Sequence, residues 1–280
     1  MKRCFLYAII LILVPVFSCT KEGGIAEAST GEIVLQVADD SMPVVVETKT
    51  TAVTSMPSSL YWGGTTGSGA SQTSKWASVS ASVSSSKINT GKYQTASPTT
   101  YNYYVSNVNM SIGANTTVSA TGGTSGTDVI CGYTEGTNST TPSITLNHVF
   151  ARTGSLTTTT SAGSLSSISY TIIKKGDGTG SSGTYNLRTG AWSSVSGLTS
   201  ATAITGSSDM YLIPGTYTIA VTATYTRGDY VVTTTKYGDV TLTGGKINNM
   251  TLTWPTAGTE IVITCSLTAW SSQSVAATLS

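Results

Sequence analysis

Charged side chains are scarce in this chain of 280 residues, and their scarcity excludes several classes of function. Lys and Arg number 14 and Asp and Glu 13, so 10% of the residues are charged and the formal net charge at pH 7 is +1. An average soluble protein carries roughly 25% charged residues. A chain without a basic excess lacks the attraction that non-specific nucleic-acid binding and polybasic membrane attachment require. We therefore expect no nucleic-acid partner.

Groups for acid–base and metal chemistry are also few. The chain has one histidine, His148, and contains neither a G-x-S-x-G motif nor a C-x-x-C pair. A Ser–His–Asp site needs a histidine base, and zinc needs three or four close ligands. Ile144, Leu146, His148 and Phe150 share one face of an expected strand, which favours a packed histidine with a local hydrogen bond over a catalytic base. We expect no enzyme, no metal site and no cofactor.

Hydroxylated residues, by contrast, make up one third of the chain, with 41 serines and 52 threonines. Such a composition can indicate a disordered stalk. However, 39% of the residues are hydrophobic, Val, Ile and Tyr recur throughout, and only 7 residues are Pro. This combination favours an extracellular all-β protein.

The N-terminus has the pattern of an export signal. Lys2 and Arg3 precede an apolar run over residues 5–17, which is 13 residues long. A membrane-spanning helix needs about 20 residues, so this run is typical of a secretory signal instead. Ser18 and Cys19 follow directly, which resembles a bacterial lipoprotein signal in which Cys19 carries the lipid. We expect attachment to the bacterial outer membrane at the cell surface; the alternative is a plain signal peptide that happens to contain a cysteine.

Two cysteines remain after the signal. Cys131 and Cys265 both lie in apolar, strand-like runs, where free cysteine is commonly buried. A disulfide between them is compatible with an oxidising compartment, but the sequence does not show that their Cα atoms lie within about 7 Å of each other. We favour two buried thiols and leave the disulfide open.

The mature chain alternates short strand patterns with turn residues and shows no long stretch of helical spacing. In the first half we predict strands over 31–39, 42–47, 60–62, 76–83, 101–112, 116–120 and 128–133. Many short strands without intervening helices predict an all-β chain of two tandem Greek-key sandwiches of the transthyretin or immunoglobulin kind. The predicted divisions are a signal peptide at 1–18, a tether at 19–30, an N-terminal sandwich at 31–142 and a C-terminal sandwich with a terminal tail at 143–280.

Three further patterns have alternative interpretations. Residues 178–183 satisfy G-x-G-x-x-G, but a strand pattern follows them, whereas a phosphate site needs a helix N-terminus there. Tyr61, Trp62 and Trp76 could form an exposed aromatic platform for sugars, although aromatic residues at strand spacing are usually core. Ser41, between Asp40 and Met42, resembles the acceptor of an O-glycosylation motif used by Bacteroidetes.

Several segments, in this order, resemble the fimbrillin family of Bacteroidales, the lipoprotein precursors of type V pili. Together they extend over essentially the whole mature chain. They are 128–133 (DVICGY), 144–152 (ITLNHVFAR), 183–192 (GTYNLRTGAW), 211–219 (YLIPGTYTI), 245–254 (GKINNMTLTW) and 260–270 (EIVITCSLTAW).

The resemblance implies assembly by β-strand exchange, in which a protease removes the first strand and a neighbouring subunit fills the vacated groove. On this interpretation, other fimbrial subunits are the partners and cell adhesion is the outcome. The strand that leaves would carry Ile33, Leu35 and Val37. The donor would be the C-terminal segment, in which Val275, Ala277 and Leu279 alternate. The alternative is that both segments are ordinary terminal strands of a monomeric surface lipoprotein that binds glycans.

The chain departs from the family in one respect. The best-known members are processed at an arginine, but the next arginine after Arg3 is Arg152, inside an expected core strand. Processing would then use Lys49 or Lys75, or a different protease, or would not occur. An unprocessed subunit would be an anchor or a terminal subunit and not part of the stalk.

The donor assignment makes a testable prediction. Leu279→Asp places a charge in the apolar strand that would enter the neighbouring groove, where an unpaired charge is costly to bury. We expect this variant to fold as a monomer but to form no polymer ladder on gels. Normal ladders from the variant would refute the assignment.

Overall fold

The computed structural model describes twelve stretches of the chain, and β-strands dominate all of them. These stretches are 32–39, 57–84, 86–94, 100–124, 126–139, 141–160, 165–198, 201–204, 209–227, 229–254, 262–269 and 276–278. The one helical element they contain is a short 3-10 helix, η1 (Gly69–Ser71). In the part of the chain described, no helix is long and apolar enough to cross a membrane. The prediction of an all-β sandwich fold is confirmed.

Seven strands of the N-terminal half close into a barrel. In ring order they are β1 (Glu32–Asp39), β4 (Lys87–Tyr93), β3 (Thr73–Ser84), β2 (Ser59–Thr66), β5 (Tyr101–Ser106), β8 (Ile130–Thr137) and β9 (Ser143–His148). Burial alternates along β9, where Ile144, Leu146 and His148 are buried and the residues between them are exposed. The predicted shared face is therefore confirmed for these three residues, whereas Phe150 lies beyond the end of β9 and is buried in a different cluster. An apolar interior fills the ring, including Leu60, Trp62, Tyr101 and Val105.

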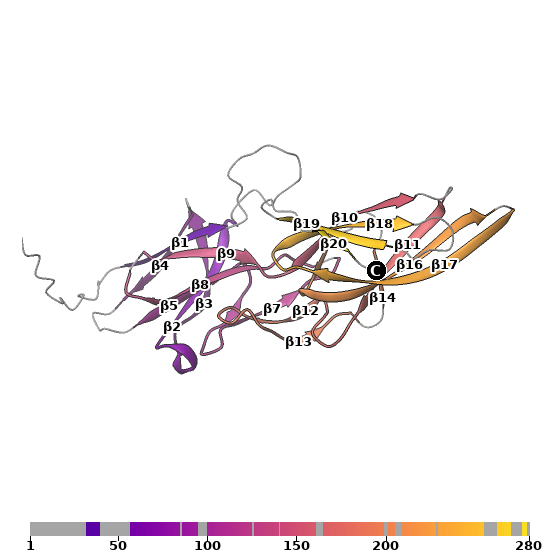
Figure 1. Cartoon of the computed structure of the whole chain (residues 1–280). Coiled ribbons are helices and arrows are strands. Elements are labelled where there is room, and N and C mark those ends of the chain that lie inside the picture. Colours follow the sequence, from indigo (N-terminus) through magenta and orange to yellow (C-terminus); the bar gives the residue numbers. More distant parts are fainter. Residues whose placement is uncertain are drawn as a thin grey trace, which may run out of the picture.

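Two sheets of the C-terminal half face each other as a sandwich. One contains β15 (Met210–Leu212), β10 (Ala151–Thr160), β18 (Lys246–Trp254), β19 (Val262–Ala269) and β20 (Ala276–Thr278). The other contains β14 (Ala201–Ile204), β11 (Leu165–Lys174), β16 (Gly215–Arg227) and β17 (Tyr230–Leu242). Their common core includes Ile172, Ile219, Val221, Met250 and Leu252. The molecule is elongated, with β1 to β4 near one end and the tip of the β16–β17 hairpin at the other (Figure 1).

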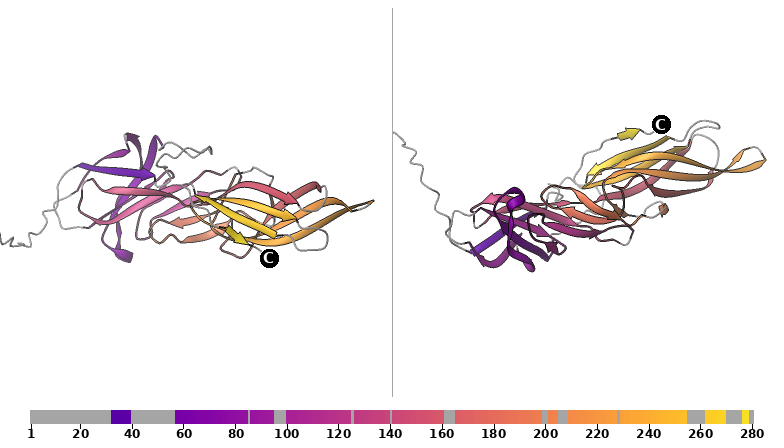
Figure 2. Two further views of the ribbon diagram at one scale, coloured as in Figure 1. Left: turned by 45° about the horizontal axis from the view of Figure 1, so that its top comes forward. Right: turned by 90° about the horizontal axis from the view of Figure 1, so that it is seen from below.

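A fourth sheet combines strands from both halves of the sequence. It contains β13 (Trp192–Ser196), β12 (Ser182–Asn186), β7 (Thr117–Thr121) and β6 (Met110–Ser111), and β7 pairs antiparallel with β12. This sheet lies between the barrel and the sandwich (Figures 1 and 2). Its core includes Tyr104 and Cys131 from the barrel together with Leu187 and Ile213 from the second half. The two parts of the chain therefore share a sheet and a core.

The strand pairing bears on two of the predicted boundaries. β9 begins at Ser143, yet it hydrogen-bonds within the barrel, and the change of sheet comes between His148 and Ala151. The division into domains at 142 and 143 stays a prediction. The predicted strand over 101–112 is interrupted, because β5 ends at Ser106 and β6 begins at Met110. The glycines at 178–183 lead into β12 and not into a helix.

Backbone hydrogen bonds join the two halves of the chain at their junction. Gly123 and Tyr211 exchange two backbone hydrogen bonds, with N–O distances of 2.7 and 3.1 Å, and the Gly122 amide donates to the Ser181 carbonyl at 2.7 Å. The His148 Nδ1 lies 2.5 Å from Asp128 Oδ2. Within the second half, Arg152 and Asp209 form an ion pair. The predicted packed histidine with a local hydrogen bond is confirmed.

Gly122 provides a test of this junction. A Cβ at Gly122 would lie 2.4 Å from the Tyr211 carbonyl oxygen, whereas a Cβ at Gly113 would meet nothing within 4 Å. Because overpacking a tight contact typically costs 1–3 kcal/mol, we expect Gly122→Ala to lower the free energy of unfolding by about 2 kcal/mol. Gly113→Ala is the matched control and should change it by less than about 0.5 kcal/mol. Equal values for the two variants in urea unfolding would contradict the role of this contact.

Candidate strand-exchange site

β1 is the strand that closes the barrel. It pairs antiparallel with β4, where Leu35 is in register with Ile88 and Gln36 with Lys87. On its other side it pairs in parallel with β9, where Gln36 is in register with Ser143. The strand order is a ring only because β1 contacts both of these neighbours. Without β1, the remaining six strands would form an open sheet with β4 and β9 at its two edges.

Leu35 is the part of β1 that enters the interior. Its side chain is 0% exposed and packs in the cluster that contains Ile88, Ile144 and Leu146. Burying a leucine side chain contributes about 1.5–3 kcal/mol. The other two residues predicted for the leaving strand lie in the same strand, and Val37 is in register with Ile144. β1 is thus held both by its backbone and by at least one deeply buried apolar side chain.

A vacated β1 position has the properties of a strand-acceptor groove. Its two walls would present backbone groups of β4 and β9 that β1 now satisfies, and unpaired strand edges readily accept another strand. The apolar lining at Ile88, Ile144 and Leu146 would favour an apolar side chain at the central position. An incoming strand must also run in the direction of β1, antiparallel to β4 and parallel to β9.

β4, which forms one wall of this position, is not among the predicted strands. Its sequence is KINTGKY, and Gly, Asn and Lys are all depleted in strands. The one sign of a strand in this sequence is the apolar, β-branched Ile88 between two polar residues. In the structure Ile88 is fully buried and both of its neighbours are exposed. Tertiary pairing with β1 overrides the weak local propensity here.

Of the residues predicted for modification and processing, the structure describes Lys75 alone. Cys19, Ser41 and Lys49 lie outside the described residues. Lys75 is exposed but lies inside β3, between Ser74 and Trp76, which are both in register with residues of β2. Cleavage at Lys75 would require this pairing to open and would separate Trp62 from its barrel, because Trp62 lies in β2. The geometry is unfavourable for processing at Lys75.

The C-terminal segment forms an edge strand. β20 pairs with β19 over three residues, with Ala277 in register with Cys265, and it is the last strand of its sheet. Val275 and Leu279, the other predicted donor residues, lie outside the described residues. In its own subunit, β20 therefore has a neighbouring strand on one side, over a short length.

The alternative of an exposed aromatic platform is not realised, because Trp62 and Trp76 pack into or against the barrel core, as aromatic residues at strand spacing usually do. Trp62 is 1% exposed and belongs to the barrel core. Trp76 stacks on Tyr101 and Tyr103 with centroid distances of 5.5 and 5.9 Å, and burial raises the pKa of Tyr103 to about 12. Trp76 still borders a groove of about 330 Å³ that Lys75 and Lys92 also line.

Cys131 is a buried free thiol, as expected from its apolar surroundings. Burial raises its pKa to about 12, so the thiolate that reacts with disulfides and metals is disfavoured at neutral pH. Cys265 lies in β19 of the sandwich, and Cys131 lies in β8 of the barrel. Cys131 therefore has a packing role.

Comparison with known proteins gives one informative match. The fold resembles that of a fimbrial protein. That protein comes from Bacteroides vulgatus ATCC 8482, and its crystal structure at 2.55 Å resolution matches with a TM-score of 0.56 over 85% of this chain and 99% of the other. The sequence identity is 12%, so the likeness is one of fold. No protein-family model matches the chain, and no curated protein matches it significantly.

The contribution of β1 to the barrel is measurable through Leu35. Truncating a buried leucine to alanine typically costs 2–5 kcal/mol, because the lost transfer free energy is combined with the cost of a cavity. We expect Leu35→Ala to lower the free energy of unfolding by about 3 kcal/mol in urea titrations. Val79 is 46% exposed on β3, so Val79→Ala should cost less than about 1 kcal/mol. Similar losses for both variants would mean that β1 is not packed as described.

Proposed function

We propose that this protein is a structural subunit of a fimbrium that is exported as a lipoprotein and assembles by β-strand exchange. In the assembled fibre, the C-terminal segment of one copy occupies the β1 position of the next. The observation that carries the proposal is that β1 is the strand whose two pairings close the barrel. The fold likeness to a fimbrial protein supports a structural, pilus-like role. The protein is not an enzyme on this proposal.

The exchange is energetically reasonable for the donor segment. In its own subunit, β20 pairs with a strand on one side over three residues. In the β1 position of a neighbour, the same backbone would pair on both sides, since β4 and β9 flank that position. Burial of the Val275 or Leu279 side chain there adds about 1.5–3 kcal/mol, and the smaller Ala277 adds less. The exchange therefore gains hydrogen bonds and buried area together.

The spacing of the two segments is compatible with this replacement. Residues 33, 35 and 37 of β1 and residues 275, 277 and 279 of the tail are apolar at every second position. Successive side chains of a strand point to opposite faces, so such residues share one face. A tail strand in the β1 position can therefore direct three apolar side chains toward the barrel interior.

Removal of β1 requires a cut between β1 and β2, and Lys49 lies in that segment. A cut there leaves β2 and its core residue Trp62 in place. We propose Lys49 as the processing site of a stalk subunit. If no cut occurs, the protein retains its lipid at Cys19 and acts as an anchor or terminal subunit.

N-terminal mass spectrometry of polymer sheared from the cell surface tests this function. We expect wild-type polymer to begin at Thr50 and to form ladders on gels. Lys49→Gln should retain the lipidated Cys19 and form no ladders. Lys75→Gln is the matched control and should behave as wild type, because Lys75 lies within a paired strand.

An intact, lipidated Cys19 in all wild-type material would overturn removal of β1 and leave an anchor or a monomeric lipoprotein. A wild-type start other than Thr50 but still between β1 and β2 would refute Lys49 alone.

A further inference from the structure

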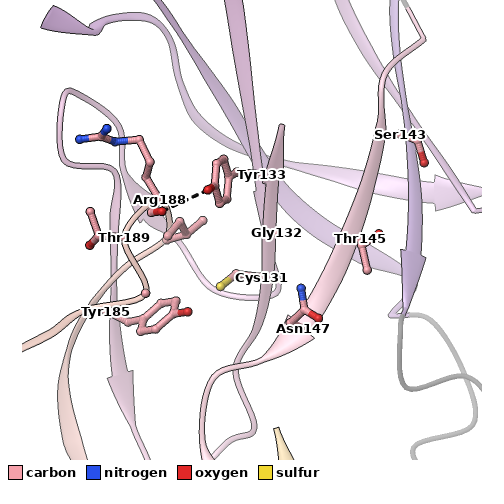
Figure 3. A pocket seen from close by; sticks show the side chains of 11 residues that line it. Cys131, Gly132, Tyr133, Ser143, Thr145, Asn147, Tyr185, Arg188 and Thr189 are labelled. Carbon is pink, nitrogen blue, oxygen red and sulfur yellow. Dashed lines mark hydrogen bonds between the residues drawn. The ribbon is translucent and has the colours of Figure 1, made fainter. Parts of the chain in front are cut away.

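A polar groove lies on the outer side of the barrel, where β8 and β9 meet the segment that follows β12. Its volume is about 430 Å³, within the range of about 300–1,000 Å³ that is usual for small-ligand sites. One wall comes from β9, and the opposite wall includes Tyr185 of β12 (Figure 3). Both halves of the sequence therefore contribute to it. Strand exchange at β1 uses the backbone edge and the inward side chains of β9, whereas the groove uses its outward side chains.

One wall is a row of hydrogen-bonding side chains. Ser143, Thr145 and Asn147 line the groove and are exposed. They alternate along β9 with buried residues, so the burial of Ile144 and Leu146 fixes their outward direction. Two hydroxyls and one amide, spaced at every second residue, provide several donors and acceptors along one line.

The other side of the groove carries two tyrosines that are held in place. The Tyr133 hydroxyl donates to the Arg188 carbonyl at 3.1 Å, and its ring stacks on Tyr104 at a centroid distance of 6.0 Å. Tyr185 packs against Trp192 at 5.1 Å. In Figure 3 the Tyr185 ring extends toward the Asn147 side of the groove. Fixed rings lose little conformational freedom when a ligand binds.

Gly132 lets the two strands at the floor of the groove approach closely. A Cβ at Gly132 would lie 2.0 Å from the Thr145 carbonyl oxygen, so a larger residue would force β8 and β9 apart. Charge is also balanced at the groove. Arg188 is the one charged residue among those that line it, and the Arg188 Nε lies 3.8 Å from Glu135 Oε1. A groove without excess charge does not select strongly for an anion or a cation.

We infer that this groove binds a neutral saccharide. A sugar ring offers hydroxyl groups that can pair with the row on β9, and its C–H faces pack on aromatic rings. A purely apolar ligand would leave Ser143, Thr145 and Asn147 without partners, which is costly. An anionic ligand would find no uncompensated cation among the lining residues. The inference is independent of strand exchange, since it concerns the outer face of the barrel.

An array of neutral and acidic glycans, probed with the purified protein, tests the inference. We expect retention of neutral glycans. Tyr133→Ala and Asn147→Ala should each weaken binding about tenfold, the effect of losing one well-placed contact. Tyr93→Ala and Asn89→Ala are matched controls on β4, where Tyr93 is 65% exposed, and they should bind as wild type.

Three outcomes would overturn the inference. The first is that no neutral glycan is retained. The second is that Asn147→Ala, which removes an exposed side chain, binds as wild type while its melting temperature is unchanged. The third is that the control variants lose as much affinity as the groove variants. Binding to acidic glycans alone is one form of the first outcome.

Discussion

The two rows of backbone hydrogen bonds along β1 are the constraint on which the barrel depends. They join β4 to β9 and so remove both free edges of the sheet at once. Backbone hydrogen bonds are nearly independent of side chains, so any strand with a matching apolar pattern can satisfy them. The feature that stabilises the isolated subunit is for this reason also the feature that would let another chain replace β1.

Threonine hydroxyl groups give this chain a polar surface although it has few charged residues. Cross-strand threonine pairs on the β16–β17 hairpin join Thr222 to Thr235 and Thr224 to Thr233, with oxygen–oxygen distances of 2.7 and 3.0 Å. Threonine is β-branched, so it favours strands, and its hydroxyl forms hydrogen bonds at the surface. The high hydroxyl content and the scarcity of charge therefore go together, because hydroxyl groups solvate and cross-link the long strands where few ion pairs are formed.

The candidate sites differ in how far the sequence predicts them. Leu35 could be identified as an inward residue of a terminal strand from its alternation alone, and its complete burial agrees. The wall formed by β4 could not, because KINTGKY lacks a strand signal of its own. The polar groove could not be predicted either, since Asn147 and Tyr185 are brought together only by pairing between distant strands.

By itself, the sequence determined the all-β class, the buried face of β9 and the packing role of His148. These features depend on a period of two residues, which is a local property of a strand. The tertiary structure alone decided which strands are neighbours, that β7 and β12 share a sheet, and that Trp62 faces the core. Pairing is non-local and is formed by backbone groups that every residue possesses, so the local pattern of side chains does not reveal which strands become neighbours.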